Sequence, residues 1–192
     1  MKKQTVYMIA GANGTGKTTF AKEFIKDKNI TFLNADEIEK QFNPDDREGG
    51  KIRAGKEFFQ RLKQLMSNNN DFVIESTLSG KSLISFLKKL KRKEVRIILL
   101  YIFLENVELA IDRVRIRVEE GGHNIPTQDI IRRYSRSINN FWNIYRDLVE
   151  EWQIFYNGEE NIIQAAFGFN DEYKIIDEDK FELFLRSLNV ED

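Results

Sequence analysis

Short apolar runs alternate along the chain with segments in which apolar residues recur at helical spacing. The apolar runs lie at residues 5–10, 30–33, 72–74, 95–103 and 153–156. They predict strands that are buried on both faces, because neither face of such a strand carries a polar stripe. The segments between them predict helices at about residues 17–27, 54–66, 82–90 and 106–118. This alternation predicts an α/β fold with a doubly wound parallel five-stranded sheet and helices on both faces.

A long helix and a C-terminal hairpin complete the predicted elements. Thr127 is the expected N-cap of an amphipathic helix that continues to about Glu151. Its apolar stripe comprises Ile131, Tyr134, Ile138, Phe141, Tyr145, Leu148 and Trp152. Residues 162–167 and 173–176 predict the hairpin, and residues 181–188 predict a closing helix. Because the sequence has no internal repeat or low-complexity linker, we expect one domain over residues 1–192, with a C-terminal extension from about residue 158.

Composition and charge exclude several classes of protein. The 192 residues contain 30 basic and 31 acidic side chains and no cysteine. This balance argues against a general nucleic-acid-binding protein, which needs a surplus of Lys and Arg to neutralise phosphates. The lack of cysteine excludes disulfides and thiolate metal sites. The longest apolar run, residues 97–104, is far shorter than the ~20 residues that span a bilayer. We therefore expect a cytoplasmic protein without a membrane or nucleic-acid partner.

A glycine-rich stretch between the first strand and the first helix matches the eight-residue P-loop pattern. It reads Gly-Ala-Asn-Gly-Thr-Gly-Lys-Thr over residues 11–18. Its glycines let successive backbone N–H groups turn toward phosphate oxygens, and the following helix directs its positive end to the same place. We expect Lys17 to reach the β- and γ-phosphates and the Thr18 hydroxyl to ligate Mg²⁺. The predicted nucleotide-binding residues are Gly11, Ala12, Asn13, Gly14, Thr15, Gly16, Lys17, Thr18 and Thr19.

A P-loop indicates a nucleoside triphosphate but leaves three classes of protein open: a small-molecule kinase, a switch GTPase, and a motor or ABC-type ATPase. The sequence contains no Asn-Lys-x-Asp string, which is typical of GTPases. Residues 78–81, Leu-Ser-Gly-Lys, weakly match an ABC signature, but no apolar strand that ends in Asp-Glu follows them closely. The kinase class is therefore favoured.

Two acidic residues follow predicted strands and are candidates for the acceptor side of a kinase. Ligands of doubly wound sheets gather at the carboxyl ends of the strands, so Asp36, after the second strand, should face the P-loop. We expect Asp36 to be the general base, although an Asp at this place could also cap a helix. Glu75, which precedes Ser76 and Thr77 at the end of the third strand, could bind acceptor hydroxyls, hold Mg²⁺ through water or pair with a lysine. We expect Asp36, Glu75 and Thr77 to contact the acceptor.

Five arginines flank a loop-like stretch at residues 119–126. They are Arg113, Arg117, Arg132, Arg133 and Arg136. Guanidinium groups bind phosphate oxygens well, so we expect a lid over about residues 117–133 that brings these cations to the transferred phosphoryl group. Each arginine could instead form ion pairs on a solvated helix face. His123, in the middle of the lid, is a further candidate for contact with phosphate or substrate. We therefore expect a cationic ATP side and an acidic acceptor side.

These motifs together resemble the zeta-toxin family of P-loop kinases, in its shorter bacterial branch. The matching segments are residues 11–19, 33–37, 75–80, 113–118, 121–126, 132–134 and 152–157. The resemblance covers about residues 5–158. It implies a fold similar to adenylate and shikimate kinases, with ATP and Mg²⁺ as cosubstrates. It also implies phosphorylation of an amino-sugar hydroxyl of UDP-N-acetylglucosamine, and a small helical antitoxin that blocks the ATP site.

The resemblance assigns roles to residues on both sides of the expected site. It implies that Asp36 is the base, that Lys17 is essential and that Glu75 contacts the acceptor. The chain departs from the longer family members, which tend to have Phe-Arg where residues 38–39 are Ile-Glu. Arg117 is the best match for the first lid arginine of the family. The place of the second belongs to His123, Arg132 or Arg133.

The sequence therefore predicts a Mg-ATP-dependent phosphotransferase of zeta-toxin type that acts on a hydroxyl of a nucleotide sugar. The expected catalytic residues are Lys17, Asp36, Arg113, Arg117, Arg132 and Arg133. Two alternatives stay open: a P-loop kinase of another small-molecule hydroxyl, and an ATP-responsive binding module whose output is a contact with a partner.

Overall fold

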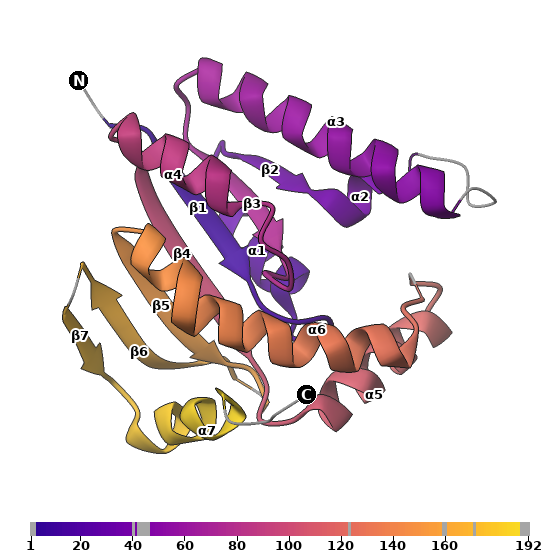
Figure 1. The fold of residues 1–192 in the computed structure, drawn as a ribbon. Coiled ribbons are helices and arrows are strands. Elements are labelled where there is room, and N and C mark those ends of the chain that lie inside the picture. Colours follow the sequence, from indigo (N-terminus) through magenta and orange to yellow (C-terminus); the bar gives the residue numbers. More distant parts are fainter. Residues whose placement is uncertain are drawn as a thin grey trace.

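A computed structural model describes residues 3–39, 41, 47–122, 124–158, 161–170 and 172–188, and for Asp36, Glu39 and residues 47–51 it describes the backbone alone. Within these residues a seven-stranded sheet forms the centre of the protein (Figure 1). In spatial order its strands are β2 (Thr31–Asn34), β3 (Phe72–Ser76), β1 (Thr5–Ala10), β4 (Arg96–Phe103), β5 (Glu151–Tyr156), β6 (Ile163–Phe169) and β7 (Glu172–Ile175).

The first five strands of this order run parallel, and β6 and β7 pair antiparallel beyond β5. The predicted parallel sheet is confirmed. The predicted C-terminal hairpin extends the same sheet by two strands, because β6 pairs with β5 along its length.

Helices cover both faces of the sheet. They are α1 (Lys17–Ile25), α2 (Ala35–Glu39), α3 (Arg47–Ser67), α4 (Ile84–Arg92), α5 (Val107–Glu119), α6 (Thr127–Asn140) and α7 (Glu178–Leu188). Successive strand residues face opposite layers: Met8 packs in the cluster that contains residues of α3, α4 and α6, whereas Ile9 packs in the cluster of α1. Figure 1 shows α3, α4 and α6 on one face of the sheet. No helix in the described part of the chain is long and apolar enough to cross a membrane.

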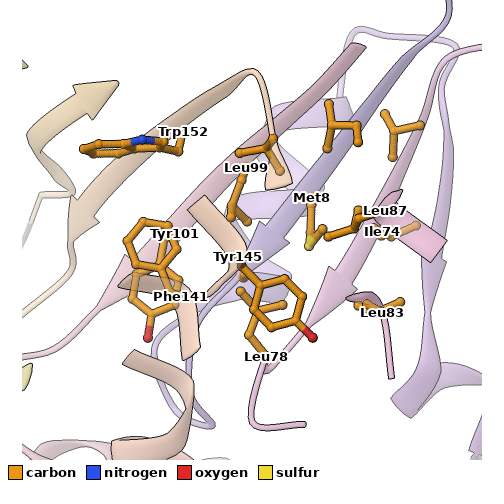
Figure 2. Close-up of a cluster of buried hydrophobic side chains, with 14 of the residues drawn as sticks. Met8, Ile74, Leu78, Leu83, Leu87, Leu99, Tyr101, Phe141, Tyr145 and Trp152 are labelled. Carbon is orange, nitrogen blue, oxygen red and sulfur yellow. The ribbon is translucent and has the colours of Figure 1, made fainter. Parts of the chain in front are cut away.

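Aromatic packing fixes α6 against the middle of the sheet. The rings of Tyr101 in β4 and Phe141 stack with centroids 4.2 Å apart, and Phe141 also meets Trp152 of β5 edge to face (Figure 2). All three residues are buried. Such pairs contribute about 0.5–1.5 kcal/mol each beyond the burial of their surface. This contact anchors the C-terminal end of α6, and the helix extends from there to the carboxyl ends of the strands.

The long helix ends earlier than its apolar stripe predicts. α6 ends at Asn140, a π-helical turn follows over residues 141–145 and a 3₁₀ turn over residues 146–148. Trp152 therefore lies in β5 and not on the helix. The reason is that alternate residues of β5 are buried while its backbone pairs with both β4 and β6. These tertiary contacts outweigh a helical pattern that happens to continue through the segment.

The start of the same helix also differs from the prediction by one residue. Pro126 is the N-cap, and Thr127 is the first residue of α6. The buried stripe begins at Ile130, which is 1% exposed, whereas the predicted Ile131 is 46% exposed. By contrast, Asn106 caps α5 as its residue type predicts, because its Oδ1 accepts from the Leu109 N–H at 2.9 Å.

Candidate active site

The predicted P-loop connects the end of β1 to the start of α1. Gly14 and Gly16 have φ angles of 82° and 87°, which other residues rarely adopt. A Cβ at Gly14 would also come within 2.5 Å of the Ala110 carbonyl oxygen in α5. Within residues 17–25, all of them described, the first helical turn contains no acidic residue and has no side-chain cap. The positive end of α1 is therefore open to bind an anion.

Lys17 is folded back onto the loop that precedes it. Its Nζ donates to the carbonyl oxygen of Ala12 at 2.7 Å, and only 6% of the residue is exposed. The Thr15 hydroxyl donates to the same carbonyl oxygen at 3.0 Å. Because these contacts hold the ammonium group at the loop, a phosphate bound there would meet it directly.

Glu75 is a carboxylate at the end of β3, only 7% exposed, that accepts hydrogen bonds from two neighbouring elements. Thr18 Oγ1 lies 2.9 and 3.1 Å from its two carboxylate oxygens, and Asn34 Nδ2 donates to it at 2.9 Å. A hydroxyl and a carboxylate so close together are oxygen ligands of the kind that Mg²⁺ prefers beside a nucleotide phosphate. Thr18 and Glu75 therefore fit a magnesium ion. The described residues contain no group of three acidic or histidine side chains that could form another metal site.

Two cavities meet at these residues. The P-loop pocket, of about 340 Å³, is lined by Asn13, Gly14, Gly16, Lys17, Thr18, Thr19, Lys22, Asn34, Glu37, Glu75, Arg113, Val114, Arg117 and Gly122. The α6 pocket, of about 500 Å³, is lined by Lys17, Asn34, Ala35, Gly55, Phe58, Phe59, Glu75, Ser76, Thr77, Ser79, Gly80, Ser82, Leu83, Arg132, Arg133 and Arg136. Both linings include Lys17, Asn34 and Glu75. A ligand in each pocket would therefore meet the other at the P-loop lysine.

The five arginines divide into two groups and do not form one cluster. Arg113 and Arg117 line the P-loop pocket, whereas Arg132, Arg133 and Arg136 line the α6 pocket. The division arises because α5 lies against the P-loop, while α6 packs on the sheet face that also carries α3 and α4. Arg133 connects the two groups, since its Nη1 donates to Asn13 Oδ1 in the P-loop at 3.4 Å.

The charge of the two pockets differs from the predicted contrast between a cationic and an acidic side. The described ionisable residues of the α6 pocket are four cations, Lys17 and the three arginines, against Glu75. Those of the P-loop pocket are also four cations against Glu37 and Glu75. Both pockets are therefore cationic in their described residues, and the expectation of an acidic acceptor side stays a prediction, because the side chain of Asp36, on which it partly rests, lies outside them. Among the three arginines of the α6 pocket, Arg132 forms an ion pair with Asp129, at a distance of 2.6 Å between Nη2 and Oδ1.

The segment after β3 is held by the end of α6 and the turn that follows it. Asn140 Nδ2 donates to the carbonyl oxygen of Leu78 at 2.8 Å, and the Tyr145 hydroxyl donates to that of Gly80 at 2.7 Å. Burial raises the pKa of Tyr145 to about 12, so its hydroxyl keeps its proton at neutral pH. The predicted acceptor residue Thr77 belongs to this segment and lines the α6 pocket.

Two of the predicted site residues lie outside the described side chains. His123 is outside the described residues altogether. Asp36 is described only as part of α2, where it is the second residue of the helix and not its N-cap. Its neighbours in the chain border different cavities, since Ala35 lines the α6 pocket and Glu37 lines the P-loop pocket.

Asn34 and Asn157 lie in the family-matching segments 33–37 and 152–157 but are not among the predicted site residues, yet both contact the predicted site. Asn34 ends β2 and donates to Glu75, and Asn157 follows β5 and donates through Nδ2 to the Thr15 carbonyl oxygen at 2.9 Å. The sequence signal that points to both residues is their position at the ends of predicted strands, because ligands of doubly wound sheets bind at the carboxyl ends of parallel strands.

The strand–loop–helix unit, the parallel strand order and the two adjoining cationic pockets define a P-loop kinase. A family model described as Zeta toxin matches residues 1–166 of the 192. The chain therefore belongs to the zeta toxin family and is an ATP-dependent kinase, which confirms the resemblance that its motifs carry.

The chain is also similar to individual proteins. A Haemophilus influenzae protein described as uncharacterized is 34% identical over 132 residues, which cover 69% of this chain and 92% of that protein. A solved chain from the PezAT chromosomal toxin–antitoxin system of Streptococcus pneumoniae has a TM-score of 0.61 at 21% identity, over 98% of this chain and 87% of its own.

A chain of the AvrRxo1-ORF1:AvrRxo1-ORF2 complex with ATP has a TM-score of 0.74 at 15% identity. The match covers 99% of this chain but 66% of the AvrRxo1 chain, slightly less than two thirds. At these identities the two solved structures show a shared fold.

Proposed function

We propose that the protein is a Mg²⁺- and ATP-dependent phosphotransferase that moves the γ-phosphoryl group of ATP onto a hydroxyl of a nucleotide sugar such as UDP-N-acetylglucosamine. The observation that carries the proposal is the meeting of two cationic pockets at Lys17, Asn34 and Glu75. Donor and acceptor bound in adjoining pockets can react without diffusing, and a site that excludes water favours transfer over hydrolysis.

The P-loop pocket is the donor side in this proposal. The loop N–H groups and the open end of α1 bind the phosphates, and Lys17 lies where it can reach the transferred group. Arg113 and Arg117 add two guanidinium groups to this pocket. Charge that develops on the phosphoryl oxygens during transfer is stabilised by such fixed cations, which is the main catalytic effect in this class of reaction.

Thr18 and Glu75 would hold the magnesium ion. When bound, Mg²⁺ neutralises charge on the β- and γ-phosphate oxygens. The protein supplies the Thr18 hydroxyl and one carboxylate, and the Asn34 amide fixes that carboxylate through a hydrogen bond of 2.9 Å. Of the alternatives that the sequence leaves open for Glu75, this arrangement supports a role at the metal.

The α6 pocket is the acceptor side, and its lining matches the parts of a nucleotide sugar. The arginines Arg132, Arg133 and Arg136 can bind a diphosphate, and four hydroxyl residues between positions 76 and 82 can hydrogen-bond a sugar. The adjacent rings of Phe58 and Phe59, at a centroid distance of 5.6 Å, can pack on a ring of the ligand.

Asp36 is the proposed general base that takes the proton of the acceptor hydroxyl. Support comes from its place in the first turn of α2, one residue after Ala35 of the α6 pocket. In this proposal its carboxylate accepts the proton as the hydroxyl oxygen bonds to phosphorus and the γ-phosphoryl group leaves ADP. Asp36→Asn keeps the shape of the side chain and removes the base.

A transfer assay tests this function. The protein is incubated with γ-labelled ATP, Mg²⁺ and, in turn, UDP-N-acetylglucosamine, N-acetylglucosamine 1-phosphate, N-acetylglucosamine and uridine. We expect label on UDP-N-acetylglucosamine, less on the sugar phosphate and none on the free sugar. Transfer to uridine or another sugar alone would favour the kinase of a different hydroxyl, and ATP binding without any transfer would favour the binding module. Undiminished transfer by Asp36→Asn would overturn the assignment of the base.

A toxin role with an antitoxin partner is the corresponding cellular proposal. It is supported by membership of the zeta toxin family and by the likeness to a chain from a toxin–antitoxin system. Induced expression should arrest growth, and expression of Lys17→Ala should not. Unimpaired growth with the wild-type protein at matched levels would contradict the toxin role.

A further inference from the structure

Asn157 joins the end of β5 to the middle of the phosphate-binding loop. Its Nδ2 donates to the Thr15 carbonyl oxygen at 2.9 Å, across 142 residues of sequence. Its backbone N–H donates to the Phe103 carbonyl oxygen at 3.0 Å, which fixes the residue to the end of β4. The preceding Tyr156 is buried and its hydroxyl donates to Glu105 at 2.7 Å. Asn157 is therefore held at the carboxyl ends of β4 and β5.

The contact with Thr15 determines which way one peptide of the P-loop faces. The described chain contains no cis peptide bond, so the C=O of Thr15 and the N–H of Gly16 point in opposite directions. The C=O points to Asn157, which is not in the lining of the P-loop pocket, whereas Gly16 is in that lining. The Gly16 N–H is therefore directed to the pocket side, where backbone N–H groups bind phosphate oxygens.

Gly16 is matched to this contact. A Cβ at position 16 would lie 2.5 Å from Asn157 Nδ2, closer than side-chain atoms can approach. The amide of Asn157 therefore reaches the loop only because residue 16 has no side chain. The φ angle of Gly16 is 87°, a backbone conformation that also favours glycine at this position.

We infer that Asn157 is a positioning residue for nucleotide binding: its amide holds the Thr15–Gly16 peptide so that the Gly16 N–H faces the phosphates of ATP. The residue acts through the loop and has no contact with the reacting atoms. The inference concerns the triphosphate alone, so it does not depend on which acceptor the kinase uses.

Calorimetric binding of a non-hydrolysable ATP analogue and of inorganic tripolyphosphate tests the inference without any acceptor. Asn157→Ala should weaken both ligands about tenfold, the effect of losing one hydrogen bond that orients a binding group. Asn157→Asp keeps the shape but replaces the donor with an oxygen that repels both the Thr15 carbonyl and the phosphates, so the loss should be larger. The exposed Asn161 lies in the same connection after β5, and Asn161→Asp is the matched control, with affinity within about twofold of wild type.

Once an acceptor is known, the steady-state constants of the same variants provide a second test. KM for ATP should rise by the factor measured in binding, while kcat and KM for the acceptor stay within about twofold. A loss confined to the ATP analogue and absent with tripolyphosphate would assign Asn157 to the nucleoside and overturn the inference. Wild-type affinity in folded Asn157→Ala and Asn157→Asp would overturn it as well. If Asn157→Ala does not fold, Asn157→Ser, whose hydroxyl is too short to reach Thr15, takes its place.

Discussion

The P-loop pocket and the α6 pocket share three residues but are built in different ways. Six of the fourteen residues that line the first come from one continuous segment, residues 13–19, whose backbone and first helical turn provide phosphate-binding groups. The second assembles side chains from α3, α6 and the segment after β3. A backbone site depends on few individual side chains, whereas an assembled site depends on each of them. Donor binding should therefore tolerate most substitutions, and acceptor choice should not.

The largest effect is expected where the two pockets meet. Lys17→Met removes the ammonium group held at the P-loop, and kcat/KM should fall about a thousandfold, as for loss of a fixed group that stabilises transition-state charge. The exposed Lys26→Met, just after the same helix, is the matched control and should retain wild-type rates. Activity of Lys17→Met within tenfold of wild type would show that the junction is not the reaction centre.

Glu75 lines both pockets, and Glu75→Gln tests the role of its negative charge. The amide keeps the size of the side chain but loses the charge that would hold Mg²⁺ with Thr18, so kcat should fall about a hundredfold and its dependence on Mg²⁺ should shift to higher concentration. Glu23→Gln on the exposed face of α1 is the control. The measurement is initial rate against Mg²⁺ concentration. An unchanged Mg²⁺ dependence would remove Glu75 from the metal site.

Arg136→Gln should affect the α6 pocket alone. Loss of one guanidinium group from an anion site should raise KM for UDP-N-acetylglucosamine about tenfold and leave KM for ATP unchanged. Arg92→Gln, at the exposed C-terminal end of α4, should change neither constant. A rise in KM for ATP instead would place Arg136 with the donor phosphates, as the lid hypothesis from the sequence expects of this cluster.

The smallest effect is expected from Tyr145→Phe, which removes the hydrogen bond to the Gly80 carbonyl oxygen. The free energy of unfolding should fall by about 1 kcal/mol, and KM for the acceptor should rise a few-fold because the segment after β3 is less well fixed. Burial raises the pKa of Tyr145 from 10.0 to about 12, so wild-type stability gains from this group below pH 10 and loses that gain as pH rises toward 12. The difference in unfolding free energy between wild type and Tyr145→Phe should therefore be constant below pH 10 and shrink above it.

The same contrast explains how much the sequence could predict. The geometry of residues 11–19 is determined by their own sequence, so the P-loop motif was enough to predict the loop and its flanking strand and helix. The division of the arginines between two pockets could not be predicted in this way, because it depends on which sheet face α6 packs against. The end of α6 was also missed, since the pairing of β5 with two strands decides the state of Trp152 and its neighbours. Asn157 ends the matching segment 152–157, but its contact with Thr15 could not be predicted, because 142 residues separate the two and only the fold brings them together.

In the proposed reaction both pockets are filled at once, and their ligands meet at Lys17, Asn34 and Glu75. Initial rates measured over a matrix of ATP and UDP-N-acetylglucosamine concentrations test it most directly. Direct transfer between adjoining ligands requires a ternary complex, so double-reciprocal plots should give intersecting lines. Parallel lines would indicate a covalent phosphoenzyme and alternating occupancy, and would contradict the account.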